Sequence, residues 1–209
     1  MGKFVNGEIY HVFNKSIASY GIFKDINNGE RFLEALDYYN KLISHYSLSG
    51  AKKLKKYTYT NLLDERKDHI VDFISYCIMP DHYHLLVKLQ SGSLSKYIND
   101  IENSFTRFFN IKFDRKGPLW QTHFKSVLIE NNDQLLHVSR YIHLNPTTGE
   151  LVKKPGDWIL SSYNDLVKGN YLEKIKEISI KSKNIYKKFV EDQQDYQLKL
   201  KQIKRKLLD

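Results

Sequence analysis

The chain has 209 residues, 41% of them hydrophobic and 13% aromatic, which is enough to bury the core of one ordinary domain and excludes general disorder. Its single cysteine, Cys77, excludes a disulfide framework and a cysteine-based zinc site, and it fits a reducing compartment. No stretch approaches the roughly 20 apolar residues that span a bilayer, and no apolar run follows a basic N-terminal head. We therefore expect a soluble, cytoplasmic protein without a membrane partner.

The net charge of +9 comes from 33 Lys and Arg against 24 Asp and Glu. Together with 15 tyrosines, this excess favours a polyanionic partner, because phosphates attract lysine and aromatic faces stack on unpaired bases. A genome that favours lysine would give the same composition, so the charge alone leaves both interpretations open.

The first third of the chain predicts a strand over residues 8–15 and a helix opened by Asn27-Asn28. Residues 47–68 break the pattern with two charged clusters, so we expect an exposed basic loop there, with or without a short helix. Such a run is ordinarily a solvated surface, and contact with phosphates is the alternative. The apolar face of the predicted helix consists of Phe32, Leu36, Tyr39 and Ile43.

A hairpin is predicted next, with strands over residues 72–78 and 85–89 and a turn at Met79-Pro80-Asp81. His82 and His84 begin its second strand, where side chains two residues apart share a face and Tyr83 points the other way. Two imidazoles on one face make a plausible but incomplete pair of metal ligands. The alternative is one hydrogen-bonded histidine near the core edge and one exposed histidine.

Two further helices follow. Ser91-Gly92-Ser93 predicts the cap of a long helix that ends before Gly117-Pro118 and buries Leu94, Ile98, Ile101, Phe105 and Phe108. Residues 117–129 then predict a loop that continues into a strand. Asn132 or Asp133 caps the second helix, which we expect to end near Leu144 because Pro146 disfavours helical geometry just before it. From Lys168 onward, a lysine-rich segment predicts a helical tail attached loosely to the core.

The second helix carries His137, Tyr141 and Asn145 at intervals of four residues, which places them along one stripe. Leu135, Leu136, Ser139 and Ile142 occupy the neighbouring face that packs on the sheet. Tyr141 thus lies at the edge of the buried face, where its hydroxyl can reach a cleft, and the Asn145 carbonyl oxygen can complete a metal site. Packing or surface filling is the ordinary alternative for a tyrosine.

These motifs carry a resemblance to a known family. Met-Pro-Asp-His-Tyr-His-Leu-Leu-Val is followed in order by Gly-Pro-Leu-Trp-Gln, Arg-Tyr-Ile-His-Leu-Asn-Pro and Ser-Ser-Tyr. The pattern, over roughly residues 8–168, resembles the IS200-like transposases, and more narrowly the REP-associated tyrosine transposases of the HUH single-strand nuclease superfamily. Members usually carry Asn where this chain has Asp81, which keeps a turn-forming side chain but adds a negative charge beside the metal site.

The resemblance implies an α+β fold, a ferredoxin-like (RRM-like) sandwich with a central antiparallel sheet over residues 1–168, and leaves residues 169–209 as a basic helical extension. It implies that His82, His84 and Asn145 bind a divalent metal, Mg²⁺ or Mn²⁺, and that Tyr141 is the nucleophile. The implied activity is that of a metal-dependent tyrosine transposase or nuclease, which cleaves and rejoins single-stranded, hairpin-flanked DNA through a 5′-phosphotyrosine intermediate during DNA transposition and recombination.

The implied partner is single-stranded or hairpin DNA at the bacterial nucleoid, and basic residues would bind this DNA. Our candidates for DNA contact are Arg107, Arg115, Lys125 and Arg140, and Trp120 either stacks on a base or packs on the sheet. Whether the protein is a monomer or a homodimer stays open.

Two rival functions remain open. One is a non-catalytic DNA-hairpin binder derived from a transposase, and the other is a metal-dependent phosphoesterase that uses water, with Tyr141 only structural. Of the other histidines, His11 and His137 lie on elements that can approach the site, although each is more often structural or exposed.

Overall fold

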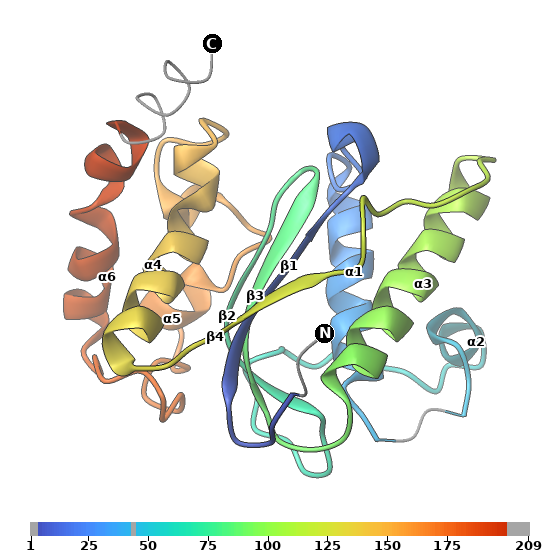
Figure 1. The fold of residues 1–209 in the computed structure, drawn as a ribbon, viewed down its shortest axis with the longest axis horizontal. Coiled ribbons are helices and arrows are strands. Elements are labelled where there is room, and N and C mark those ends of the chain that lie inside the picture. The colour runs from blue at the N-terminus through green and yellow to red at the C-terminus, as the bar shows by residue number, and fades with distance from the viewer. Residues whose placement is uncertain (1–3, 43–44, 200–209) are drawn as a thin grey trace.

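A four-stranded antiparallel sheet with helices on both faces forms the centre of the fold in the computed structural model, which describes residues 4–42 and 45–199 (Figure 1). The strands lie in the order β2-β3-β1-β4 and are β1 (Ile9–Lys15), β2 (Val71–Ile78), β3 (His82–Leu89) and β4 (Lys125–Leu128). The predicted α+β class is therefore confirmed. Among the described residues, no helix combines the length and apolarity needed to cross a membrane.

The helices divide between the two faces of the sheet. On one face lie α1 (Ile26–Tyr39) and α3 (Leu94–Lys112), with the short α2 (Leu48–Lys53) beside them; on the other face lie α4 (Asn132–Thr148), α5 (Tyr163–Val167) and α6 (Lys183–Glu191) (Figure 1). Two single turns of 3-10 helix, Ile17–Ser19 and Pro155–Asp157, complete the regular structure. The two faces can therefore serve different purposes, and the predicted site residues divide between them.

The predicted hairpin is confirmed and sets the direction of its side chains. β2 and β3 pair with Cys77 opposite His84 and Ile78 opposite Tyr83, and the Met79 N–H donates to the His82 carbonyl at 2.8 Å across the turn. Tyr83 packs under the α1–α3 face, where its hydroxyl donates to the buried Glu102 carboxylate at 2.7 Å. His84 projects to the opposite, α4 face, as strand alternation requires.

The α1–α3 face holds an aromatic core that fixes this side of the sheet. Phe32 and Leu36 of α1 are buried, as their helical spacing predicted, whereas Tyr39 is half-buried and Ile43 lies outside the described residues. Of the face predicted for α3, Leu94, Ile98, Ile101 and Phe105 are buried, whereas Phe108 is only half-buried; Ser93 is the N-cap of this helix. The insertion after α1 contributes buried Leu48 and Leu62 and keeps its lysines exposed, so the 47–68 segment is only partly a solvated loop.

The bounds predicted for α4 are wrong at both ends. The side chain of Asn131, rather than Asn132 or Asp133, caps the helix and accepts from the Gln134 N–H at 2.9 Å. At the other end, the helix continues through Pro146 to Thr148. Pro146 removes one hydrogen-bond donor, but its ring and Thr147 are buried, and the Gly149 and Leu151 N–H groups satisfy the last carbonyls. Packing of the final turn thus outweighs the local preference of the sequence to end the helix before Pro146.

The expectation of a loosely attached tail is wrong for the part that the structure describes. Leu172 and Ile178 are fully buried, and α6 buries Tyr186 and Val190 against the outer side of α4 (Figure 1). The Tyr186 hydroxyl lies 3.1 Å from Nδ1 of the buried His143 on α4. Residues 200–209 lie outside the described residues, and the domain boundary at residue 168 stays a prediction.

Candidate active site

The strands β1 and β3 and the helix α4 together form a small polar pocket on the α4 face of the sheet. Antiparallel pairing places Phe13 opposite His84 and Lys15 opposite His82. Tyr141 approaches from α4 and packs edge-on against His84, with 5.4 Å between the ring centroids. The pocket has a volume of about 290 Å³, and its lining residues are Phe13, Asn14, Lys15, His82, His84, Gln121, Thr122, Lys125 and Tyr141. The structure therefore brings three of the four predicted catalytic and metal-binding residues together.

The His82 ring is hydrogen-bonded to Asp81, its neighbour in the turn. Its Nδ1 lies 2.5 Å from Oδ1 of Asp81, and the other oxygen of that carboxylate lies 3.3 Å from the Lys15 ammonium. Partial burial raises the pKa of Asp81, but the hydrogen bond with His82 and the charge of Lys15 outweigh it, so the net shift is downward. The Asp81 carboxylate is thus paired with both His82 and Lys15 and is ionised at neutral pH.

The His84 ring is hydrogen-bonded to a third histidine, His11. Its Nδ1 lies 3.0 Å from Nε2 of His11, and both residues are buried. Burial lowers the pKa of His11 to about 4, and burial with the neighbouring imidazoles lowers the pKa of His84 well below its usual value. Both rings are therefore neutral at physiological pH, the form in which imidazole binds metals. The suggestion that His11 approaches the site is confirmed.

Tyr141 is 42% exposed at the rim of the pocket. Burial of its inner edge raises the pKa of its hydroxyl, with a hydrogen bond from Asn145 acting in the opposite direction, so the phenol is protonated at neutral pH. A role as nucleophile therefore requires a group that takes or offsets the phenolic proton.

Asn145 does not line the pocket. Its side-chain N–H donates to the backbone carbonyl of Tyr141 at 2.9 Å, one turn earlier on the same helix. The amide of Gln121, which sequence reasoning missed, lines the pocket beside both histidines. Gln121 ends the Gly-Pro-Leu-Trp-Gln motif, but the local sequence indicated no role for it in the site, because only the tertiary fold brings the loop before β4 beside the hairpin. Asn145 as third ligand stays a prediction.

The donor set fits a cation that accepts nitrogen ligands. Asp81 and His11 engage Nδ1 of the two imidazoles, so coordination by either ring would be through Nε2. Oxygen donors nearby are the Gln121 amide and the Thr122 hydroxyl. Within the described ranges, no group of three or more His, Cys, Asp or Glu is placed to hold a metal ion. The pocket thus suits two imidazoles completed by amide, water or phosphate oxygens.

Of the five predicted DNA-contact residues, only the exposed Lys125 lines this pocket. Trp120 is half-buried in the aromatic core, 5.6 Å from the Tyr83 ring, and its indole N–H donates to the Glu102 carbonyl at 3.3 Å. The structure therefore favours packing over base stacking for Trp120. Arg115 donates to the Asn110 side chain and the Pro118 carbonyl, so it fastens the loop after α3.

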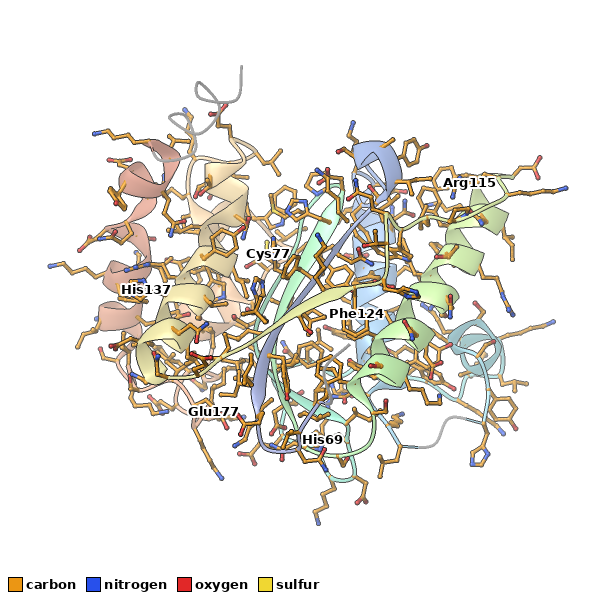
Figure 2. The ribbon with its side chains drawn as sticks, in the orientation of Figure 1. His69, Cys77, Arg115, Phe124, His137 and Glu177 are labelled. Atoms are coloured by element: carbon orange, nitrogen blue, oxygen red, sulfur yellow. The ribbon has the colours of Figure 1, made fainter. Side chains whose placement is uncertain are left out.

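The remaining two arginines also lie away from the pocket. Arg107 lines a larger cavity of about 700 Å³ in the α1–α3 layer, across the sheet from His84. Arg140 donates to Nδ1 of His137 at 2.7 Å and stacks over the Phe189 ring of α6. Figure 2 shows His137 on the α4–α6 side of the molecule and Arg115 at the far end of α3. The suggestion that His137 approaches the site is therefore wrong.

Comparisons with known proteins agree with the sequence motifs. Residues 47–145, a range that contains His82, His84, Tyr141 and Asn145, match the family model described as "Transposase IS200 like". A putative REP-associated tyrosine transposase from Haemophilus influenzae is 30% identical over 106 residues, which are 46% of this chain and 60% of the relative. The chain thus matches less than two thirds of the length of that relative.

A solved structure of a similar protein shows the same fold. A REP-associated tyrosine transposase bound to a REP hairpin superposes with a TM-score of 0.57 and 18% identity over 80% of this chain and 86% of that one. A putative transposase from Deinococcus radiodurans gives a TM-score of 0.37 and 13% identity over 68% of this chain and 94% of that one. The family model and the curated relative confirm that this chain resembles the IS200-like transposases, and more narrowly their REP-associated tyrosine branch.

Proposed function

We propose that the chain is a metal-dependent tyrosine transposase or nuclease that cleaves and rejoins single-stranded, hairpin-flanked DNA. The observation that carries the proposal is the contact between Tyr141 and His84 in the pocket that also contains His82. In this pocket, the proposed nucleophile lies beside the two proposed metal-ligating side chains. They come from distant parts of the sequence and share one opening to solvent.

In the proposed reaction, the phenolic oxygen of Tyr141 attacks the scissile phosphorus. The bond from phosphorus to the 3′ oxygen breaks, the DNA leaves with a 3′-hydroxyl, and the phenolic proton passes to that oxygen or to solvent. A bound divalent cation would offset the charge that develops on the phosphate. Lys15 and Lys125, which line the pocket, are placed to attract the phosphates of the strand. The resulting 5′-phosphotyrosine conserves the bond energy, so a second 3′-hydroxyl can reverse the step without ATP.

His82 and His84 are the proposed metal ligands, with an amide oxygen from Asn145 or Gln121. Because imidazole is softer than the all-oxygen shell that Mg²⁺ prefers, we expect Mn²⁺ to support the reaction at least as well as Mg²⁺. The proposal includes a hairpin as the specificity element, supported by the relative whose structure is described as bound to a REP hairpin. It also includes a ferredoxin-like core, supported by the order β1-α1-β2-β3-α3-β4, and a location at the nucleoid.

The test is to incubate the protein with labelled single-stranded hairpin DNA from its own genomic flanks. Mn²⁺, Mg²⁺ or EDTA is added, and the products are run on a denaturing protein gel for wild type, Tyr141→Phe and the control Tyr196→Phe, whose tyrosine is exposed on the tail. We expect a metal-dependent covalent band in wild type and in the control, and none in Tyr141→Phe.

Two results would replace the proposal. Tight hairpin binding that survives Tyr141→Phe, without a band in any metal, would make the chain a non-catalytic hairpin binder. Metal-dependent cleavage that survives Tyr141→Phe and leaves no covalent adduct would identify a phosphoesterase that uses water.

A further inference from the structure

Two side chains outside the predicted catalytic set lie directly behind the pocket. Asp81 lies 2.5 Å from Nδ1 of His82, and His11 lies 3.0 Å from Nδ1 of His84. Each imidazole on the pocket wall therefore has its own partner on the same ring atom. A neutral imidazole carries one proton, so the partner on one nitrogen decides whether the other has a lone pair.

The partner of His82 dictates its tautomer. An ionised carboxylate only accepts hydrogen bonds, so the proton between Asp81 and His82 must lie on Nδ1 of the imidazole. Lys15 pairs with the second oxygen of the same carboxylate at 3.3 Å, so each oxygen of Asp81 faces a hydrogen-bond donor. The Nε2 atom of a neutral His82 then carries a lone pair.

The partner of His84 allows two arrangements that differ in their consequence. If His11 donates from Nε2, His84 accepts at Nδ1 and carries its proton on Nε2, which blocks coordination there. If His84 donates from Nδ1, the lone pair lies on its Nε2. His84 lines the pocket and His11 does not, so only the second arrangement presents a lone pair to the pocket.

We propose that Asp81 and His11 are positioning residues that hold His82 and His84 as Nδ1–H tautomers with Nε2 directed at a divalent cation. The inference rests on the metal role of the two histidines in the proposed function. Hydrogen-bonded partners behind metal-ligating histidines generally fix ring orientation and raise ligand basicity. This role also explains Asp81 at a position where IS200-like transposases usually carry Asn. A carboxylate is a stronger acceptor for the imidazole N–H than a neutral amide.

The tautomers can be measured without metal or DNA. Two-bond ¹H–¹⁵N correlation spectra of the metal-free, ¹⁵N-labelled protein at neutral pH distinguish the two tautomers of each histidine. We expect His82 and His84 as Nδ1–H tautomers, and a shift of His84 toward the Nε2–H tautomer in His11→Leu. An Nε2–H tautomer of His84 in the wild type, or a spectrum that His11→Leu leaves unchanged, would overturn the proposal.

Metal affinity gives the second readout. We expect His11→Leu and Asp81→Ala each to raise the Kd for Mn²⁺, measured by calorimetry, by about 10- to 100-fold. His11→Gln and Asp81→Asn keep a carbonyl acceptor and should recover most of that loss. His45→Leu, at an exposed position, is the matched control and should leave the Kd unchanged. Equal losses in His11→Leu and His11→Gln would indicate a packing role only and contradict the proposal.

The two proposals fail in different ways. If the tautomers and Kd values behave as expected but no covalent adduct forms, the metal site stands without the transposase chemistry. If the adduct forms while His11→Leu alters neither the tautomer nor the Kd, the nuclease stands and the positioning role is wrong.

Discussion

The Tyr141 ring meets the His84 imidazole at 5.4 Å between centroids and 78° between planes. One residue lies on a helix and the other on a strand almost 60 positions earlier in the chain, so the contact exists only because α4 packs across β2 and β3. Whatever holds α4 on the sheet therefore also positions the proposed nucleophile.

Replacement of Tyr186 by Phe should show that α6 helps to hold α4. The change removes a buried hydroxyl that bonds to His143 and Ser139 of α4 and leaves both without that partner. An unsatisfied buried polar group costs about 1–3 kcal/mol, so we expect urea unfolding to report a loss of that size. Tyr196→Phe, at an exposed position, is the control. Equal stability of both variants would mean that the tail does not stabilise the helix.

Glu102 should make stability depend on pH. Burial raises its pKa to about 7, above the usual 4.5, with hydrogen bonds from Asn14 and Tyr83 acting in the opposite direction. Because the folded state binds the proton more tightly than the unfolded state, its contribution to stability is present at low pH and is lost as pH rises from about 4.5 to about 7. Removing the charge should remove that loss.

The test variant is Glu102→Gln, which keeps an oxygen acceptor for Asn14 and Tyr83. Between about pH 5 and pH 8, its stability relative to the wild type should improve by up to about 3 kcal/mol, because the pKa of Glu102 is raised from 4.5 to about 7 on folding. Urea unfolding of both proteins at the two pH values measures this difference. A difference that does not change with pH would show that Glu102 titrates normally.

Lys125 should bind DNA phosphate, whereas Trp120 should not contact DNA. We expect Lys125→Gln to weaken single-stranded DNA binding and to reduce the slope of log K against log salt by about 0.7. Lys53→Gln, on α2 of the opposite layer, is the control. Fluorescence anisotropy over a salt series measures both slopes, and equal slopes in Lys125→Gln and wild type would exclude a phosphate contact.

The two amides near the site make a further prediction. If Asn145 becomes a ligand by releasing the Tyr141 carbonyl, Asn145→Ala should raise the Kd for Mn²⁺ about 10-fold or more, and Gln121→Ala should change it far less. Calorimetry on the two variants at fixed pH ranks them. The reverse ranking would assign the oxygen ligand to Gln121, which already lines the pocket.

Local patterns were sufficient for the elements that carry the site. The alternation around Met79-Pro80-Asp81 predicted the hairpin and the opposite faces of Tyr83 and His84, because strand geometry is a property of neighbouring residues. The four-residue spacing on α4 likewise predicted Tyr141 at the edge of the buried face. These features need no knowledge of distant contacts.

Features that depend on distant partners were left open or predicted wrongly from the sequence. Pairing of β1 with β3 brings His11 beside His84, and no local pattern around His11 indicates that neighbour. Trp120 joins the core because it packs against Phe32 of α1 and Phe105 of α3, and Pro146 stays helical because its turn is buried. In each case tertiary packing decides between alternatives that the local sequence leaves open.

Locating the DNA link on the protein tests Tyr141 as the nucleophile. After reaction with hairpin DNA and Mn²⁺, the adduct is digested with nuclease and protease, and the peptides are analysed by mass spectrometry. We expect a 5′-linked nucleotide on Tyr141 and none in samples with EDTA. A nucleotide on another residue, or cleaved DNA with no modified peptide, would contradict that role of Tyr141.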